Sequence, residues 1–235
     1  MLCYIADLLV EIPAAGGMAP RCRDYLTDRK EPADIEIRQE EYDLAWWNTD
    51  DEDLATYIES GLHFYVQLLR FNGMLLHASA VEWNGKAYLF SGPSGMGKST
   101  HTCLWQQHFG NAAQVFNDDK PALRLIDGRW FAYGTPWCGK NGINQNRKVP
   151  LGGICFLKRG EKNRIRRLPS AEAVPLIYGQ TVYGLRKAEN ALRLMDNVDA
   201  LVRKIPIFEM ECRPDTDAVI LSSRTMQEAA EKENL

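Results

Sequence analysis

The sequence predicts an α/β protein with a mixed sheet, in which an antiparallel strand precedes a phosphate-binding loop. Residues 92–99 read Gly-Pro-Ser-Gly-Met-Gly-Lys-Ser and fit the pattern G-x-x-x-x-G-K-[ST]. Directly before this loop, Asn84-Gly85 joins two apolar runs, which is a strong hairpin signal. Doubly wound P-loop proteins surround the motif with parallel crossovers, so the hairpin indicates a mixed sheet instead.

The amino-terminal part, residues 1–72, is expected to form two strands and a helix that pack on the core. Apolar residues extend over 2–12 and alternate over 33–38, as in strands. Apolar residues three and four apart between 51 and 70 predict an amphipathic helix, and the carboxylates at 50–53 lie at its positive end. No Ser/Gly-rich or Pro-rich linker follows, so we expect one unit with the core.

Residues 73–227 are expected to form the catalytic core. Strands at 74–83 and 86–91 flank the hairpin turn, and a helix through 101–109 follows the loop until Gly110. Further strands are expected at 113–116, 122–126, 129–133, 149–157, 164–168 and 205–212. Further helices are expected after Ser170, over about 187–203 and after Pro214, and the tail 228–235 is expected to fray.

The glycine-rich loop predicts a nucleotide site with ATP and Mg²⁺ as cofactors. Glycines let the backbone approach phosphate closely, and the amides at a helix start point at the anion. Lys98 would reach the β and γ phosphates, and Ser99 would offer its hydroxyl to Mg²⁺. The expected nucleotide-binding residues are Gly92, Pro93, Ser94, Gly95, Met96, Gly97, Lys98, Ser99 and Thr100. The motif leaves the choice between adenine and guanine open.

The composition argues against a nucleic-acid partner. The 235 residues are 45% hydrophobic, which is ample for a core, and 28 basic against 31 acidic residues give a net charge of −3. No basic stripe with interleaved aromatic residues is present, so no nucleic-acid partner is expected. Arg164, Arg166 and Arg167 are interpreted as a solvated strand face.

A cytoplasmic protein without membrane contact is expected. No apolar stretch reaches the roughly 20 residues of a membrane span, and the first residues lack a basic leader. The six cysteines form no C-x-x-C pair and the four histidines show no ligand spacing, which predicts reduced thiols and no structural zinc.

Asp118 and Asp119 follow an apolar strand about twenty residues after the loop, where a phosphate site needs acidic groups to hold Mg²⁺ and orient a nucleophile. A simple turn before Lys120-Pro121 is the alternative interpretation. His77 lies in the strand before the hairpin. It is either a hydrogen-bonded core residue or a group that tunes Asp118.

The polar segment 133–148 is too long for a tight hairpin, and long ordered loops are commonly functional. Its polar side chains are candidates for contacting an acceptor or the γ-phosphate: Thr135, Lys140, Asn144 and Arg147. The alternative is a surface excursion that Trp137 and Cys138 pin to the core.

The stretch LLHASAVEWNGKAYLFSGPSGMGKST, followed by VFNDDKPAL, resembles the catalytic domain of HPr serine kinase/phosphorylase, which shares its core with phosphoenolpyruvate carboxykinase. The resemblance extends from Met74 to Leu221 and is specific over 74–123. It implies a P-loop kinase core in which Asp118 is the acid/base, Asp119 and Ser99 attend Mg²⁺, Lys98 holds phosphate and His77 supports Asp118. MECRPDTDAVIL resembles the family's Arg-Pro segment, which makes Arg213 a candidate phosphate contact.

The leading hypothesis is therefore an ATP-dependent and Mg²⁺-dependent kinase that phosphorylates a hydroxyl, either a serine of a small protein or peptide or a small metabolite. HPr itself is not the expected acceptor, because the regulatory domain and docking helix of that family have no counterpart here. A nucleotide-binding regulatory module without phosphoryl transfer is the alternative, and carboxykinase activity is a third. HPr kinases form hexamers, so the resemblance implies a homo-oligomer as one state to expect, but the sequence leaves the oligomeric state open.

Overall fold

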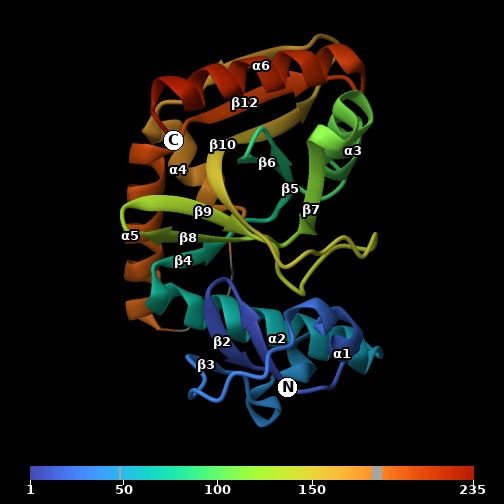
Figure 1. The fold of residues 1–235 in the computed structure, drawn as a ribbon, viewed down its shortest axis with the longest axis vertical. Helices are drawn as coiled ribbons and strands as arrows, with labels where there is room; N and C mark the ends of the chain where they lie inside the picture. Colours follow the sequence, from blue (N-terminus) through green and yellow to red (C-terminus); the bar gives the residue numbers. More distant parts are fainter. Residues whose placement is uncertain (48, 182–186) are drawn as a thin grey trace.

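The computed structural model describes residues 1–47, 49–181 and 187–235. An amino-terminal unit lies at one end of the molecule, and a larger curled sheet with helices on both faces forms the rest (Figure 1). Short helical turns punctuate the chain at Met18–Arg21 (α1), Arg23–Tyr25 (η1), Gln39–Glu41 (η2), Leu44–Trp47 (η3), Leu69–Phe71 (η4) and Gly110–Ala112 (η5).

The amino-terminal unit contains a three-stranded sheet of β1 (Leu2–Ile5), β2 (Leu8–Glu11) and β3 (Ile35–Glu36). The strand predicted at 2–12 is thus two antiparallel strands. Ala6 and Asp7 form the turn between them with φ of 52° and 59°, the left-handed pair that a two-residue hairpin loop requires. The sequence did not indicate this turn, because it lies within an apolar run and neither of its residues is a glycine.

Helix α2 (Glu52–Leu68) joins this unit to the large sheet and confirms the helix predicted over 51–70. The Asp51 side chain caps it by accepting a hydrogen bond from the Leu54 amide at 2.9 Å. The buried face of α2 packs in one core cluster with β1, β2 and residues of the large sheet such as Tyr133. This shared core fixes the amino-terminal unit against the strands.

The large sheet has nine strands in the part of the chain that the structure describes, in the order β4-β8-β9-β10-β6-β5-β7, with β12 and β11 continuing from β10. The strands are β4 (Gly73–Leu75), β5 (Ala78–Trp83), β6 (Lys86–Ser91), β7 (Ala113–Asp119), β8 (Ala122–Ile126), β9 (Arg129–Tyr133), β10 (Lys148–Arg159), β11 (Arg164–Arg167) and β12 (Ile207–Cys212). Strand β10 runs parallel to β6 and β12, and the other pairs of this sheet are antiparallel. The predicted mixed sheet and the β5–β6 hairpin are therefore confirmed.

One predicted strand, 74–83, is divided. Strand β4 pairs with β8, whereas β5 pairs with β6 and β7 on the far side of the sheet. At the break, the His77 amide donates to the Gln180 carbonyl at 2.7 Å. His77 therefore lies between two strands. Its amide is held by a distant segment, and its carbonyl accepts a hydrogen bond from the Ser91 hydroxyl of β6 at 2.8 Å.

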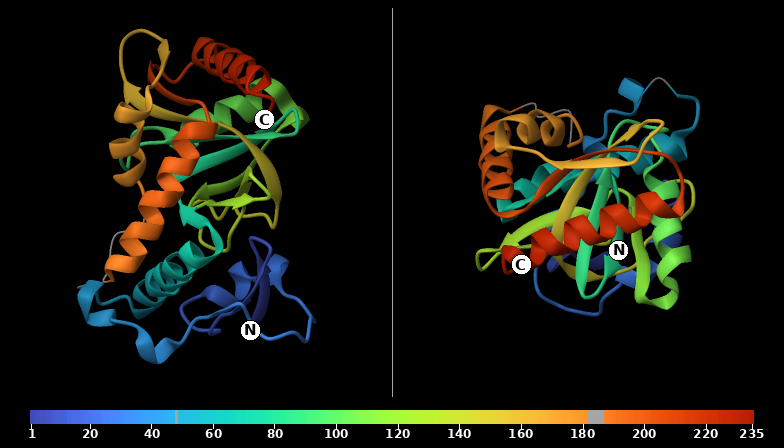
Figure 2. Two further views of the ribbon diagram at one scale, coloured as in Figure 1. Left: turned by 90° about the vertical axis from the view of Figure 1, so that its left-hand side faces the viewer. Right: turned by 90° about the horizontal axis from the view of Figure 1, so that it is seen from above.

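Helices lie on both faces of the large sheet (Figure 2). Helices α3 (Lys98–Phe109) and α6 (Thr216–Lys232) pack on one face around Trp105, and α4 (Ser170–Tyr178) and α5 (Ala188–Lys204) pack on the other. Helix α6 continues to Lys232 and Leu235 packs against the core, so the expected fraying of 228–235 is not seen. None of the described helices combines the length and the apolar character of a transmembrane span.

Candidate active site at the glycine-rich loop

The glycine-rich loop, residues 92–97, and the Asp118-Asp119 pair meet at one edge of the sheet. Strand β5 runs antiparallel between β6 and β7, and its first residue, Ala78, lies opposite both Ser91 and Asp119. The carboxyl ends of β6 and β7 therefore lie at the same edge. The glycine-rich loop and the aspartate pair are about twenty residues apart in the sequence, and the order of the strands brings them close together in space.

The loop connects β6 to α3, as the motif predicts. Gly95 and Gly97 have φ of 76° and 102°, and a Cβ atom at either position would meet nothing within 4 Å. The first amides of α3 have no intrahelical acceptor and lie at the positive end of the helix dipole. The loop therefore offers an open surface of amides suited to an anion.

Lys98 is folded into this loop. Its ammonium donates to the Gly92 carbonyl at 2.9 Å and to the Pro93 carbonyl at 3.3 Å, and only 7% of the residue is exposed. Burial lowers the pKa of Lys98, whereas the carboxylates of Asp119 and Asp118 oppose that shift. The Lys98 ammonium therefore lies next to the loop amides. Phosphate oxygens can replace the two carbonyl oxygens as its hydrogen-bond acceptors.

Asp118 lies against the start of α3. Its Oδ1 accepts a hydrogen bond from Ser99 Oγ at 2.8 Å, and its Oδ2 accepts one from Asn141 Nδ2 at 3.2 Å. Only 4% of Asp118 is exposed. A carboxylate and a hydroxyl side by side are the hard oxygen donors that Mg²⁺ prefers, and Mg²⁺ needs few protein ligands because it keeps several waters. The donor set therefore fits a magnesium ion.

Asp119 has different partners. Its Oδ1 lies 2.8 Å from His77 Nε2 and its Oδ2 lies 2.8 Å from Lys120 Nζ. Burial alone would raise the pKa of Asp119, but hydrogen bonds and charge from His77 and Lys120 outweigh it and lower the pKa well below its usual value. The carboxylate is therefore ionised at neutral pH.

The backbone at Asp119 is strained. Its φ is 107°, a conformation that residues with a Cβ rarely adopt. The Asp119 backbone pairs with Cys138 across an isolated bridge, and the Gly139 amide donates to the Asp118 carbonyl at 2.5 Å. Strain of this kind persists only where surrounding structure imposes it, and it is concentrated at functional sites.

These contacts differ from those expected. His77 was expected to support Asp118, and Ser99 was expected to attend Mg²⁺ together with Asp119. The structure instead pairs His77 with Asp119 and Ser99 with Asp118. The reason is the pleat of β7, because successive side chains of a strand point to opposite faces.

Gln180 holds the other side of the His77 ring. Its Oε1 lies 3.1 Å from Nδ1 of His77, and its carbonyl accepts the His77 amide. The neighbouring Thr181 hydroxyl donates to the Leu75 carbonyl at 2.8 Å. The segment after α4 therefore fixes the histidine, a role that no sequence signal at Gln180 indicates.

The segment 134–147 closes over the aspartate pair, but three of its four candidate residues are engaged elsewhere. The Thr135 hydroxyl is buried and donates to the Lys120 carbonyl at 2.8 Å. Asn144 donates to the Arg21 carbonyl at 3.1 Å, and Arg147 forms an ion pair with Glu82 at 2.6 Å. These side chains hold the segment in place.

The other two candidates for acceptor or phosphate contacts, Lys140 and Arg213, differ in their side-chain contacts. Lys140 is exposed, and no hydrogen bond or ion pair of its side chain is found among the described residues. Arg213 forms an ion pair with Asp215 at 2.9 Å, next to the start of α6. Neither makes a described contact with the glycine-rich loop.

The amino-terminal part of the chain supports the segment that covers the aspartates, which the sequence did not indicate. The Tyr57 hydroxyl donates to the Cys138 carbonyl at 2.8 Å, and Arg21 donates to Cys138 Sγ at 3.1 Å. The Lys120 ammonium lies 5.1 Å from the centre of the Tyr57 ring. Residues of α1 and α2 thus support the segment that covers the aspartates.

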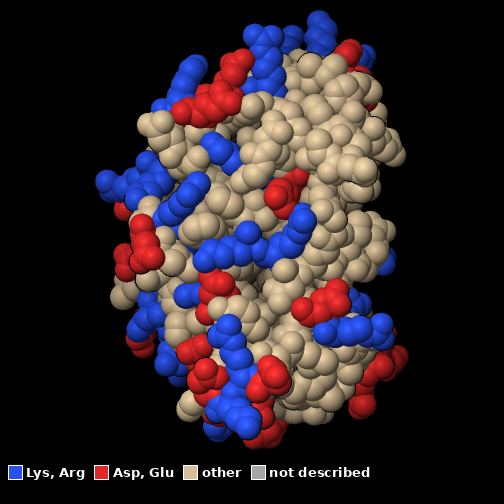
Figure 3. All heavy atoms as spheres, viewed as in Figure 1, with Lys and Arg blue, Asp and Glu red and all other residues tan. Residues whose placement is uncertain are grey.

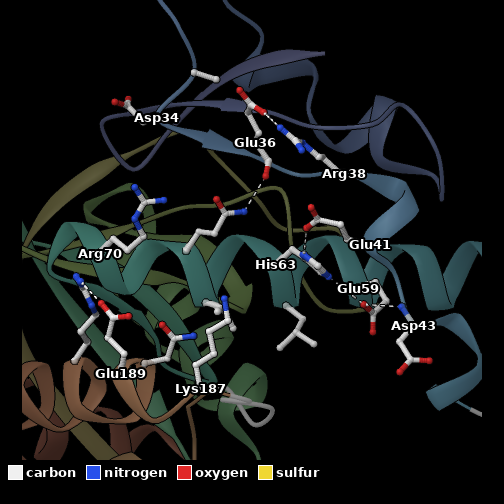
Figure 4. A pocket seen from close by; sticks show the side chains of 16 residues that line it. Asp34, Glu36, Arg38, Glu41, Asp43, Glu59, His63, Arg70, Lys187 and Glu189 are labelled. Carbon is white, nitrogen blue, oxygen red and sulfur yellow. Dashed lines mark hydrogen bonds and ion pairs between the residues drawn. The ribbon is translucent and has the colours of Figure 1, made fainter.

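A separate cavity of about 700 Å³ lies between α2, residues 33–43 and the start of α5 (Figure 4). Several of its charged side chains are paired with one another, including Arg38 with Glu36 and Arg193 with Glu189. No residue of the glycine-rich loop or the aspartate pair lines it. The cavity is therefore distinct from the site at the sheet edge.

Basic and acidic side chains are interspersed on the face of the molecule shown in Figure 3. The arginines of β11 are exposed, and Arg166 forms ion pairs with Glu172 at 2.7 Å and Glu209 at 3.0 Å. Arg167 likewise pairs with Glu233. These arginines belong to a solvated face with local acidic partners, as the sequence pattern indicates.

A protein-family model described as SynChlorMet cassette protein ScmC matches residues 47–215. No curated protein matches the sequence. Among solved structures, the chain is similar to the Hpr(Ser) kinase/phosphatase from Coxiella burnetii, with 12% identity and a TM-score of 0.40, over 68% of this chain and 92% of that chain.

Proposed function

The chain belongs to the ScmC family of SynChlorMet cassette proteins, and from its site we propose that it is an ATP-dependent and Mg²⁺-dependent kinase that phosphorylates a hydroxyl. One observation carries this proposal. Two carboxylates lie beside a glycine-rich loop, one held by Ser99 at 2.8 Å and the other by His77 at 2.8 Å. Phosphoryl transfer requires two tasks, charge stabilisation at the phosphates and orientation of the acceptor, and two carboxylates with different partners can each serve one of them.

The amides of the loop and the start of α3 bind the phosphates. Lys98 exchanges its hydrogen bonds to the Gly92 and Pro93 carbonyls for hydrogen bonds to phosphate oxygens. The ammonium stays buried, and its new partner is an anion. Ser99 and Asp118 would hold Mg²⁺, and the ion would supply charge neutralisation at the phosphates. This assignment exchanges the roles expected from the sequence, where Asp119 was the metal ligand and Asp118 the acid/base.

Asp119 accepts the proton of the acceptor hydroxyl. Its low pKa makes it a weak base, but the transition state of phosphoryl transfer is loose, so orientation of the hydroxyl matters more than early proton removal. His77 and Lys120 hold the carboxylate in place from both oxygens. The negative charge of a bound triphosphate would raise the pKa of Asp119 and improve it as a base.

Incubation of the protein with Mg²⁺, γ-labelled ATP and cell extract tests the proposal, with the label traced by mass spectrometry. We expect the label on a hydroxyl of a peptide, small protein or metabolite, and its loss in Lys98→Ala and Asp119→Asn. Lys162→Ala is the matched control, because Lys162 is an exposed lysine outside the site. Label appearing only as free phosphate would contradict kinase activity.

Calorimetry separates a kinase from a regulatory module. Asp119→Asn should bind ATP within a few-fold of the wild-type affinity while losing transfer, because Asp119 acts on the acceptor. ATP binding without transfer to any acceptor in the extract would favour a nucleotide-binding regulatory module instead.

A further inference from the structure

Strand β10 runs parallel to β6 and extends past its end, toward the glycine-rich loop that follows β6. Phe156 of β10 lies opposite Ser91, the last residue of β6, and β10 continues to Arg159. A Cβ atom at Gly92 would lie 3.3 Å from the Leu157 carbonyl, so the two backbones are close here. The end of β10 is therefore positioned to contact the loop.

The last two residues of β10 point to opposite faces of the sheet. Lys158 forms an ion pair with Glu209 of β12 at 2.5 Å. Arg159, on the other face, donates from Nη2 to the Gly95 carbonyl at 2.6 Å. Only the second of these neighbouring cations contacts the loop.

The Gly95 carbonyl belongs to the same peptide group as the Met96 amide. That amide donates to the Pro93 carbonyl at 3.2 Å. The 95–96 peptide is thus held at both ends, by Arg159 on its oxygen and by Pro93 on its nitrogen. Glycine at 95 would otherwise allow this peptide to rotate and turn a carbonyl toward a bound phosphate.

We propose that Arg159 is a positioning residue for the nucleotide, which fixes the 95–96 peptide so that the amides of the loop are arranged before the phosphates bind. This inference rests on the proposed nucleotide site. A guanidinium donates a charge-assisted hydrogen bond to the carbonyl, and an ordered loop avoids the entropy cost of ordering on binding. The contact acts on the loop and requires none with the γ-phosphate.

Calorimetry with AMP, ADP and ATP tests this assignment in wild type, Arg159→Met and Arg159→Lys. Arg159→Met should weaken ADP and ATP by the same factor, roughly five- to tenfold, which corresponds to about 1 kcal/mol, and leave AMP unchanged. Arg159→Lys should recover most of the affinity, because it keeps a charged donor. In transfer assays, the KM for ATP should rise in Arg159→Met with kcat within about twofold of wild type.

Lys158→Met is the matched control, since it removes the neighbouring positive charge without a contact to the loop. Equal affinities in wild type and Arg159→Met, or an equal loss in Lys158→Met, would overturn the inference. A larger loss for ATP than for ADP would also overturn it, because that result requires direct contact with the γ-phosphate. Failure of the wild-type protein to bind any nucleotide would refute the proposed function itself, whereas normal wild-type binding with an unaffected Arg159→Met refutes only the role of Arg159.

Discussion

The Nε2 atom of His77 lies 2.8 Å from Oδ1 of Asp119, although the two residues are on different segments and 42 positions apart in the sequence (119 minus 77). His77 is at the break between β4 and β5, and Asp119 ends β7. The pair forms because β5 and β7 are antiparallel neighbours, with Ala78 opposite Asp119. An ionised carboxylate is thereby held in one orientation next to the glycine-rich loop.

We predict that His77→Gln and Asp119→Asn each lower kcat by about 10² to 10⁴, the usual range for groups that handle the transferred proton. Because both residues act through the same contact, the double variant should be little worse than the more damaging single one. Steady-state kinetics of the four proteins tests this coupling. Fully multiplicative effects of the two substitutions would show that His77 and Asp119 act independently.

Ser99 and Asp118 should control the response to magnesium. Ser99→Ala removes the hydroxyl that contacts Asp118, and we expect the Mg²⁺ concentration for half-maximal activity to rise by about tenfold or more. Ser99→Thr keeps the hydroxyl and should retain a response close to wild type. A magnesium titration that gives the same midpoint for alanine and threonine would argue against this site.

Acid should destabilise the fold through His101. This residue is 3% exposed, and its Nε2 accepts a hydrogen bond from Trp105 Nε1 at 3.2 Å; burial lowers its pKa from 6.5 to about 4. Between those values the unfolded chain binds more protons than the folded chain, so stability present above pH 6.5 is lost as the pH falls. The loss from pH 7.5 to 5 should be about 2 kcal/mol.

Urea unfolding of wild type and His101→Asn at both pH values measures this contribution. The variant should be less stable at pH 7.5, and its stability should depend less on pH. Parallel pH dependences in the two proteins would show that carboxylates alone account for the acid sensitivity.

Gly134→Ala should disturb the segment that covers the aspartates. A Cβ atom there would lie 1.8 Å from the Gln145 carbonyl oxygen and 3.2 Å from that of Phe116, and backbone atoms cannot move aside cheaply. We expect a loss of about 2 to 3 kcal/mol in the free energy of unfolding. Gly142→Ala, in open space with φ of 67°, should cost only about 1 kcal/mol. Thermal unfolding of both variants tests the difference, and equal losses would contradict it.

Local patterns were enough to predict most of the elements around the site. The Asn84-Gly85 turn, the loop at 92–99 and α5 over about 187–203 follow from turn chemistry, motif spacing and helical periodicity. The division of 2–12 and of 74–83 was not predicted. A continuous apolar run carries no mark of a left-handed Ala-Asp turn or of a change of sheet partner.

Within the site, residue types were more predictable than contacts. The loop and the two carboxylates were identified from the sequence, but their partners were exchanged, because the pleat of β7 decides which aspartate faces Ser99. Gln180 and Arg159 were missed because each reaches the site from a distant segment. Asn141 lies in the candidate segment 133–148 but was not among the residues chosen from it. Arg147 and Asn144 were suggested by their polarity, yet their hydrogen bonds hold the covering segment.

The chain by itself determined that a glycine-rich loop enters a helix and that paired carboxylates end a later strand, because both depend on backbone freedom and on residue order over a few positions. Only the tertiary structure decided that His77 faces Asp119, that Ser99 faces Asp118 and that Arg159 contacts Gly95. These contacts depend on strand order and register, which are set by packing between segments far apart in the sequence.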